Sequence, residues 1–432
     1  MRSILLATAG CLFSVLQAQS QSAAIKKWAD TQLLQQAPLK QTQTGISIYE
    51  PATGKYWLQH HDDQFFTPAS NVKIFALYAG LKLLGDSLPG ARYYENDTAL
   101  FVQGMGDPSF LHPDYTWQPL LQLLQTTAKK IYLVPAVNQY QRFGPGWAWD
   151  DYADDYQPEL NEWPMYGNVA RLYHHRDTSS ILPGLFTLQT TVDATLRSPV
   201  MKRDERSNTF SLQYNPADRS VSKGYVPFMT GTITDLQQRL EDTLHRRISI
   251  ATVPPAGPFK ILNSIPADSL YAPMMHRSDN FFAEQILLMS AARQWDTLNN
   301  KKTIDYLLSG PLKGLPDSPQ WVDGCGLSRY NLFTPRDFVT ILTKLYREYP
   351  QDRLWEIFPT GGKEGTLKNY YTQQFVHAKT GSFTGAVALS GYLVTRKNKV
   401  LVFSVLVNNN REKAGGVRRA VERLLTMIWK EY

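Results

Sequence analysis

Ser70-Asn71-Val72-Lys73 is the first of three short motifs that decide how this sequence is interpreted. Ser278-Asp279-Asn280 and Lys379-Thr380-Gly381 follow it along the chain. Together they supply a serine, a lysine three residues later, a second serine with a nearby amide, and a second lysine. A serine hydroxyl is a weak nucleophile at neutral pH and needs a base within hydrogen-bond reach. The combination is typical of an acyl-transfer site that works without histidine.

The spacing of Ser70 and Lys73 places both side chains on one face of a helix. The apolar residues of Val72–Leu84 predict that this helix is buried. A lysine acts as a base only when its pKa is depressed, and burial or a second nearby cation lowers it. Lys379 is the candidate second cation. A helix N-terminus also directs N–H groups toward the serine, which suits an oxyanion hole.

Each motif alone has a simpler explanation. A serine that caps a helix ahead of an exposed lysine is common. Ser278-Asp279-Asn280 could merely begin a helix over Phe281–Met289, and Lys379-Thr380-Gly381-Ser382 could end an edge strand. Their joint occurrence in this order favours the catalytic interpretation. The sequence holds no Gly-x-Ser-x-Gly elbow and no His-Glu-x-x-His motif, so we expect neither a metal nor another cofactor.

Length and composition predict a well-packed protein of more than one domain. The 432 residues exceed what one hydrophobic core usually supports. Hydrophobic residues make up 43% of the chain and aromatic residues 12%, which excludes a disordered protein. The net charge of +7 comes from basic residues scattered singly and in pairs. Without a basic cluster or a recognised module we expect no nucleic-acid partner, whereas weak attraction to an anionic cell-wall polymer stays open.

Residues 1–20 are predicted to be a cleaved signal peptide. Met1-Arg2-Ser3 is a charged start, and Ile4–Leu16 is apolar but too short to span a bilayer. The small residues of Gln17-Ala18-Gln19-Ser20 suit cleavage near Ser20. Cys11 comes too early for a lipoprotein acceptor, so we expect no lipid anchor. The sequence therefore predicts an exported, periplasmic protein without a transmembrane anchor.

Patterns at both ends of the chain predict one mixed sheet flanked by helices. Near the N-terminus, a helix over Ala23–Gln36 precedes strands at Gly45–Tyr49 and Tyr56–Leu58. Near the C-terminus, a hairpin of Val387–Thr395 and Lys399–Val407 precedes a final helix. The fold class expected is α/β (α+β), with a sheet built from both ends.

The middle of the chain has a different character, with short alternating strands such as Leu185–Thr191 and Thr209–Tyr214. Insertions are tolerated best in exposed loops whose ends lie close together. We therefore expect a discontinuous catalytic domain formed by 21–90 plus 265–432, with one or more β-rich inserted domains over 91–264.

The motifs and their surroundings resemble the low-molecular-mass class C penicillin-binding proteins, the D-alanyl-D-alanine carboxypeptidase/endopeptidase family. The resemblance covers essentially the whole chain after the signal peptide. It is carried by Pro68–Lys73, Gly104–Pro108, Gly146–Asp151, Asp323–Arg329, Gly365–Leu367 and Ala378–Ser382. The long gap between the first and second motifs is also a mark of this family. The resemblance implies a transpeptidase domain like that of penicillin-binding proteins and serine β-lactamases, with an antiparallel sheet flanked by helices.

The resemblance also implies roles for the motif residues. Ser70 is acylated by the penultimate D-Ala carbonyl of a peptidoglycan stem peptide, and Lys73 is its base. Ser278 and Asn280 relay the proton to the leaving group and hold the substrate amide. The binding site for the terminal carboxylate matches Lys379, Thr380, Gly381 and Ser382, and the oxyanion hole matches the N–H groups of Ser70 and Ser382.

In family members that act on diaminopimelate-containing stems, an acidic, an aromatic and an arginine side chain hold the third residue of the peptide. The matching positions are Asp151, Tyr156 and Arg329, whose alternative explanation is ordinary surface hydrogen bonding. Cys325 departs from the family by replacing the usual serine, which puts fine substrate preference in doubt. The segment Gln157–Asn161 resembles a β-lactamase deacylation loop only by coincidence, because it precedes the Ser278 motif.

The sequence therefore predicts a serine D-Ala-D-Ala carboxypeptidase that acts on peptidoglycan stem peptides, and it leaves DD-endopeptidase activity open. Without a deacylating glutamate, β-lactam antibiotics are expected to be long-lived covalent inhibitors. One alternative is a β-lactamase or esterase on the same fold. Another is a non-catalytic module that binds the cell wall or senses β-lactams. The intact set of Ser70, Lys73, Ser278, Asn280 and Lys379 argues against a pure binder.

Overall fold

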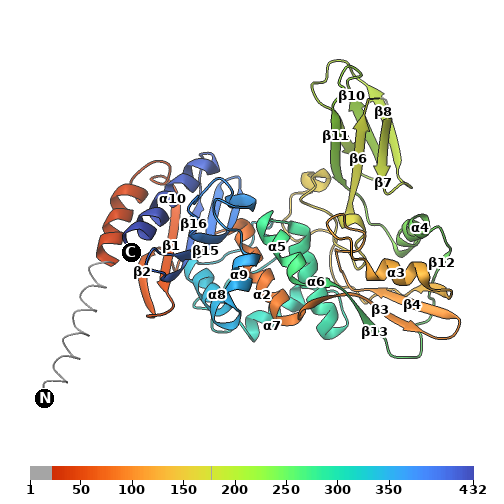
Figure 1. Cartoon of the computed structure of the whole chain (residues 1–432), viewed down its shortest axis with the longest axis horizontal. Coiled ribbons are helices and arrows are strands. Elements are labelled where there is room, and N and C mark those ends of the chain that lie inside the picture. The colour runs from red at the N-terminus through yellow and green to blue at the C-terminus, as the bar shows by residue number, and fades with distance from the viewer. Residues whose placement is uncertain (1–21, 177) are drawn as a thin grey trace. The chain divides into compact units, whose positions relative to one another are not determined.

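The computed structural model describes residues 22–176 and 178–432 of the chain (Figure 1). These residues form two compact units. The first comprises the described residues up to Tyr78, with Ala272–Ser278 and Leu308–Tyr432, and the second comprises Ala79–Tyr271 and Asp279–Leu307. The domain limits expected from the sequence stay a prediction. The expected signal peptide and Cys11 lie outside the described residues.

An antiparallel five-stranded sheet forms the centre of the first unit, in the order β14-β15-β16-β1-β2. The strands are β1 (Gln43–Glu50), β2 (Lys55–His60), β14 (Val376–Phe383), β15 (Ala386–Val394) and β16 (Val400–Asn408). Strands from the two ends of the sequence meet where β1 pairs with β16. This pairing confirms that one sheet is built from both ends of the chain. The mixed sheet expected from the patterns is wrong, because every pair of neighbouring strands is antiparallel, as the family resemblance implied.

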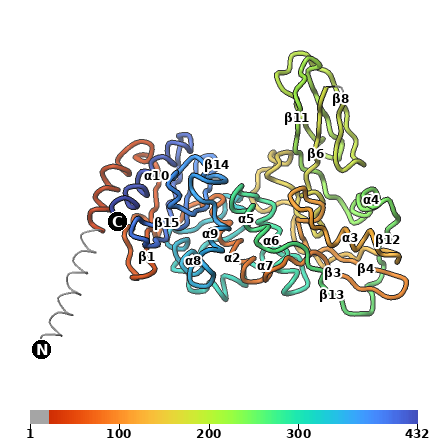
Figure 2. The backbone as a smooth tube through the Cα atoms, viewed as in Figure 1, coloured from red at the N-terminus to blue at the C-terminus, as the bar shows by residue number. Residues whose placement is uncertain are grey.

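Helices cover both faces of this sheet (Figure 1). Residues 22–29 are helical and continue into η1 (Asp30–Leu34), which packs with α10 (Ala414–Glu431). Figure 2 shows this N-terminal segment beside α10 at the C-terminus. Their apolar side chains share one core with β1 and β16, including Ile25, Ile48, Phe403, Leu424 and Ile428.

The other face of the sheet is covered by α8 (Pro335–Glu348), which packs against β1, β15 and β16. Thr334 and Asp337 form a capping box that defines where α8 begins. The helix expected over Val72–Leu84 is present as the 3₁₀ turn η2 (Ala69–Val72) followed by α2 (Lys73–Leu83). In α2 every residue except Lys82 is buried, as expected for a helix that is apolar on all sides.

The second unit is rich in strands, as the sequence between 91 and 264 indicated. One sheet has the order β12-β5-β4-β3-β13, and two three-stranded sheets have the orders β11-β6-β7 and β8-β10-β9. The strands are β3 (Ser87–Glu95), β4 (Ala99–Gly104), β5 (Lys130–Leu133), β6 (Val169–His175), β7 (Thr178–Leu182), β8 (Thr187–Val192), β9 (Val200–Arg203), β10 (Thr209–Tyr214), β11 (Val221–Pro227), β12 (Ile248–Ile250) and β13 (Lys260–Pro266).

The remaining helical elements are short or lie near the motifs. They are α3 (Pro119–Thr126), η3 (Trp149–Ala153), η4 (Tyr166–Asn168), α4 (Ile233–Leu244), α5 (Asp268–His276), α6 (Asn280–Trp295), α7 (Asn300–Ser309), α9 (Gln351–Ile357) and η5 (Gly365–Leu367). The helix expected over Phe281–Met289 corresponds to α6. Among the helices formed by the described residues, none combines the length and the apolar character needed to cross a membrane.

His377 on β14 is a buried titratable group next to α9. Its ring stacks on Trp355 with a centroid distance of 4.3 Å and an interplanar angle of 2°. Its Nδ1 lies 3.0 Å from Thr360 Oγ1. Burial, together with the charge of Lys363, lowers the pKa of His377 to about 4. The folded protein therefore keeps this ring neutral at pH values where the unfolded chain protonates it.

We expect the free energy of unfolding to fall as the pH drops from 6.5, the ordinary pKa of histidine, to about 4. His377→Phe keeps an aromatic ring on Trp355 but cannot bind the proton. Between about pH 7 and about pH 4.5, the free energy of unfolding of this variant should therefore fall by about 2 kcal/mol less than that of the wild type. Urea unfolding at both pH values measures the difference. Equal losses in the two proteins would show that His377 does not contribute.

Candidate active site

A row of four buried polar side chains crosses the sheet of the first unit. Lys379 lies opposite Ser390, Ser390 opposite Ser404, and Ser404 opposite Ser47. Residues opposite one another in paired strands project from the same face of a sheet. Asn71 of η2 joins this row, because its Nδ2 donates to Ser390 Oγ at 2.7 Å and Ser390 Oγ donates to Ser404 Oγ at 2.8 Å. The 3₁₀ turn that carries the first motif is thus anchored to the middle of the sheet.

Two glycines allow the backbone around Ser70 to pack closely. Gly326 has a φ of +88°, and a Cβ placed on it would overlap the carbonyl oxygen of Ala69. A Cβ on Gly381 would lie 3.0 Å from the Ser70 nitrogen, which is tighter than ordinary contacts. Ala69 itself has a φ of 48°, in the left-handed region that non-glycine residues rarely adopt. Strained conformations of this kind concentrate at functional sites.

Ser70 and Lys73 are in direct contact, as their spacing predicts. Lys73 Nζ donates to Ser70 Oγ at 2.9 Å and to the carbonyl oxygen of Cys325 at 2.5 Å. The Lys73 side chain is fully buried, and Ser70 is partly exposed. The thiol of Cys325 points elsewhere, since its Sγ lies 3.6 Å from Asp323 Oδ2. Cys325 is buried and forms no disulfide with any described residue.

Ser278 and Lys379 form a second contact of the same kind. Lys379 Nζ donates to Ser278 Oγ at 2.9 Å and to the carbonyl oxygen of Thr380 at 2.7 Å. Burial lowers the pKa of Lys379 well below its usual value, and the charges of Lys73 and Arg418 act in the same direction. Ser278 has a φ of 64°, so a second residue of the site has left-handed backbone.

The outer end of β14 contacts two residues to which the sequence analysis gave no role. Thr380 Oγ1 donates to Thr366 Oγ1 of η5 at 2.7 Å. Ser382 is exposed, and Arg418 Nη2 of α10 donates to its Oγ at 3.0 Å. Arg418 has no motif around it, and in the sequence it is one of many scattered basic residues. Thr366 lies within a segment that carries the family resemblance, which is the one signal that could have singled it out.

Arg329 lies beyond the same end of β14. It is exposed, its Nη1 donates to the carbonyl oxygen of Thr384 at 3.3 Å, and its guanidinium lies 4.5 Å from the ring centroid of Phe383. In the first unit the structure therefore brings Ser70, Lys73, Ser278 and the Lys379–Ser382 segment together, with Arg329 attached to the residues that follow the segment.

Three predicted residues lie in the second unit, where they contact one another. Asn280 is the first residue of α6, and its Nδ2 donates to the carbonyl oxygen of Tyr156 at 2.9 Å. The Tyr156 hydroxyl donates to Asp154 Oδ2 at 3.0 Å. Partial burial and hydrogen bonds to Asp154 and Asp151 raise the pKa of Tyr156 above its usual value. Asp279 serves as the N-cap of α6 by accepting a hydrogen bond from Phe282 N at 3.0 Å.

The chain is similar to known proteins over most of its length. The penicillin-sensitive carboxypeptidase A of Dictyostelium discoideum is 22% identical and aligns with 90% of this chain and 87% of its own length. The D-alanyl-D-alanine carboxypeptidase of Actinomadura sp. strain R39 is 23% identical, over 93% of this chain and 83% of its own. The crystal structure of penicillin binding protein 4 from Haemophilus influenzae superposes with a TM-score of 0.72 at 18% identity, covering 90% of this chain and 97% of that one.

The structural match confirms the predicted fold class. A family model described as the D-Ala-D-Ala carboxypeptidase 3 (S13) family matches residues 25–427, which is nearly the whole of the described chain. The chain therefore belongs to this family, which confirms the serine D-Ala-D-Ala carboxypeptidase that its three motifs predicted.

Proposed function

We propose that the protein removes terminal D-Ala from peptidoglycan stem peptides through an acyl-enzyme on Ser70. The observation that carries this proposal is the 2.9 Å contact between Ser70 Oγ and the fully buried Lys73 Nζ. Two ammonium groups buried near each other are costly, and Lys73 and Lys379 are both buried. In its neutral form Lys73 Nζ accepts the Ser70 proton as the oxygen attacks the penultimate D-Ala carbonyl.

The other residues then act on the leaving group and on the negative charges. We assign proton transfer to the leaving D-Ala to Ser278, which is held by Lys379, and recognition of the substrate amide to Asn280. The segment Lys379–Ser382 binds the terminal carboxylate, and the N–H groups of Ser70 and Ser382 form the oxyanion hole. Arg418 adds a second cation at this end of β14 through its contact with Ser382. Water then releases the acyl group from Ser70.

We assign the third residue of the stem peptide to Asp151, Tyr156 and Arg329. An acidic side chain and a guanidinium together suit a residue that carries both an ammonium and a carboxylate, as diaminopimelate does. The same site would accept a cross-linked peptide, so DD-endopeptidase activity is part of the proposal. Within the second unit, the contacts of Tyr156 with Asp154 and Asn280 support the part of this proposal that concerns Tyr156.

β-Lactams are proposed as covalent inhibitors that acylate the same serine. The names of two similar proteins, a penicillin-sensitive carboxypeptidase and a penicillin binding protein, support this part. Cell-wall substrates also imply that the protein is exported. We propose a periplasmic location, which rests on the charged and apolar start of the sequence and on the membership of the family.

An intact-mass time course with benzylpenicillin tests the nucleophile. The wild type should gain the mass of one penicillin and keep it, because the motifs of the sequence include no deacylating glutamate. Ser70→Ala should gain none, and Ser318→Ala, which removes an exposed serine elsewhere in the first unit, should behave as the wild type does. An adduct that disappears while penicillin is consumed would instead identify a β-lactamase. No adduct on the wild type would favour a binding module.

The charge of Arg418 provides a pH test of Lys379. Removing a neighbouring cation raises the pKa of Lys379. In Arg418→Gln the part of the pH–rate profile that depends on Lys379 should therefore move to higher pH, by up to about one unit. The measurement is the second-order rate constant of acylation by benzylpenicillin across the pH range. Arg419→Gln is the matched control, because Arg419 is exposed and pairs with Glu422. If the pH–rate profile is unshifted in both variants, the charge of Arg418 does not act on Lys379.

A further inference from the structure

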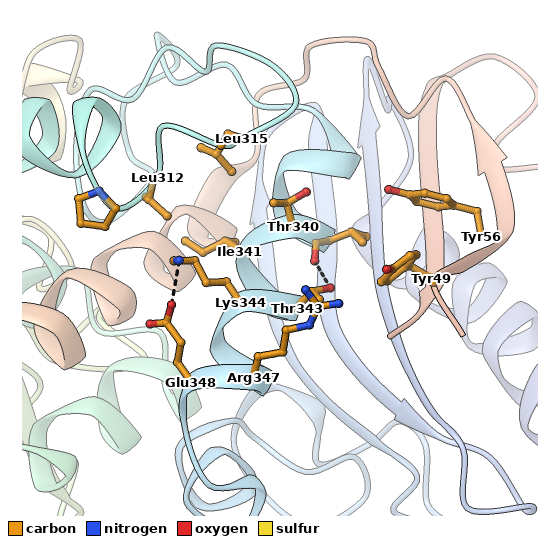
Figure 3. Close-up of a pocket in the computed structure, with 14 residues that line it drawn as sticks. Tyr49, Tyr56, Leu312, Leu315, Thr340, Ile341, Thr343, Lys344, Arg347 and Glu348 are labelled. Atoms are coloured by element: carbon orange, nitrogen blue, oxygen red, sulfur yellow. Dashed lines mark hydrogen bonds and ion pairs between the residues drawn. The ribbon is translucent and has the colours of Figure 1, made fainter. Parts of the chain in front are cut away.

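A cavity of about 530 Å³ lies in the first unit, away from the residues of the active site. It is bounded by the β1–β2 hairpin, by residues 311–315 after α7, and by one face of α8 (Figure 3). Its volume lies within the usual range of small-ligand sites. None of the residues to which a catalytic or substrate-binding role was assigned lines it. The cavity therefore needs an explanation of its own.

Arg347 supplies an uncompensated positive charge to this cavity. Its guanidinium makes no hydrogen bond or ion pair with any residue that the structure describes. The neighbouring Lys344 is different, because its Nζ forms an ion pair with Glu348 at 2.8 Å. Figure 3 shows the Arg347 side chain directed from α8 toward Tyr49. One net positive charge thus faces the space between α8 and the hairpin.

Two tyrosines form the wall opposite α8. The rings of Tyr49 and Tyr56 pack with their centroids 4.9 Å apart, and Tyr56 is 39% exposed. Both hydroxyl groups point into the cavity (Figure 3). Neither hydroxyl has a hydrogen-bond partner among the described residues. Tyrosines of this kind combine a large apolar surface with a polar tip that a ligand can use.

Leu312, Leu315 and Ile341 supply an aliphatic part of the remaining wall, which also includes Thr340 and Thr343. The cavity thus offers one free guanidinium, two free hydroxyl groups and an aliphatic surface, all within the first unit. A planar guanidinium fork matches a carboxylate in two parallel hydrogen bonds. A dianion is disfavoured, because among the described residues that line the cavity only Arg347 is a cation without a partner, and Glu348 adds a negative charge beside Lys344.

We propose that this cavity binds the C-terminal carboxylate of a peptide that ends in an apolar or aromatic residue. Arg347 holds the carboxylate, the hydroxyl groups of Tyr49 and Tyr56 bind the adjoining amide, and the aliphatic wall accepts the terminal side chain. The ligand is not changed chemically there. The proposal is independent of the chemistry at Ser70 and describes a second, non-catalytic site.

Calorimetric titration of the full-length protein with N-acetyl-L-phenylalanine tests the proposal. This probe carries one carboxylate, one amide and one aromatic side chain. Its neutral analogue N-acetyl-L-phenylalaninamide should bind at least about tenfold more weakly, since it lacks the charge that Arg347 recognises. Arg347→Gln should weaken binding of the acid by a similar factor and leave binding of the amide unchanged. Arg423→Gln, which removes an exposed arginine of α10, should bind both probes as the wild type does.

Three results would overturn the proposal. The first is equal binding of the acid and the amide, and the second is unchanged binding of the acid to Arg347→Gln. The third is displacement of the acid by inorganic phosphate at the same concentration, which would identify a phosphate site instead. Tyr56→Phe keeps the ring and removes only the hydroxyl, so a few-fold loss of affinity in this variant separates hydrogen bonding from simple packing. A circular-dichroism spectrum of each variant controls for folding.

Discussion

The row of hydrogen-bonded polar groups across the sheet is the constraint on which the first unit depends. Buried polar atoms are costly unless they are paired, and Ser390, Ser404 and Asn71 pair with one another between apolar layers. Because Asn71 belongs to the same 3₁₀ turn as Ser70, the hydrogen bonds of this row also determine where the proposed nucleophile lies. The register of β14 against β15 places Lys379 in the same row. The residues that pack the middle of the sheet therefore also position the proposed catalytic groups.

The site concentrates features that are unfavourable elsewhere in a protein. Two lysines are fully buried, and Ala69 and Ser278 have left-handed backbone. Each of these features disfavours the folded state locally and persists only where the surroundings determine the conformation. The apolar core shared by β1, β16 and α10 lies on the opposite side of the sheet and provides that stability. A rigid sheet is therefore a condition for keeping the amines beside the two serines.

The three motifs could be found in the sequence because each consists of side chains that the proposed chemistry requires. The sheet was predictable as well, since short runs of apolar residues mark β1 and the β15–β16 hairpin at opposite ends of the sequence. Arg418 and the carbonyl oxygen of Cys325 could not be found in this way. In the sequence Arg418 is one basic residue among many, and only the fold brings it to Ser382 of β14. The carbonyl oxygen of Cys325 is a backbone atom, whose position no side chain in the sequence indicates. The cavity beside Arg347 likewise exists only once three distant segments have packed together.

The pairing of β1 with β16 has a consequence for how the protein is made. A ribosome synthesises the N-terminal strand early and its hydrogen-bonding neighbour almost last, because Gln43 of β1 pairs with Asn408 of β16. Contacts so distant in sequence form slowly. The five-stranded sheet against which the Ser70 turn packs is therefore complete only after β16 has been synthesised. Chains that end before Val376 also lack β14, the strand that carries Lys379, so they cannot assemble the proposed site.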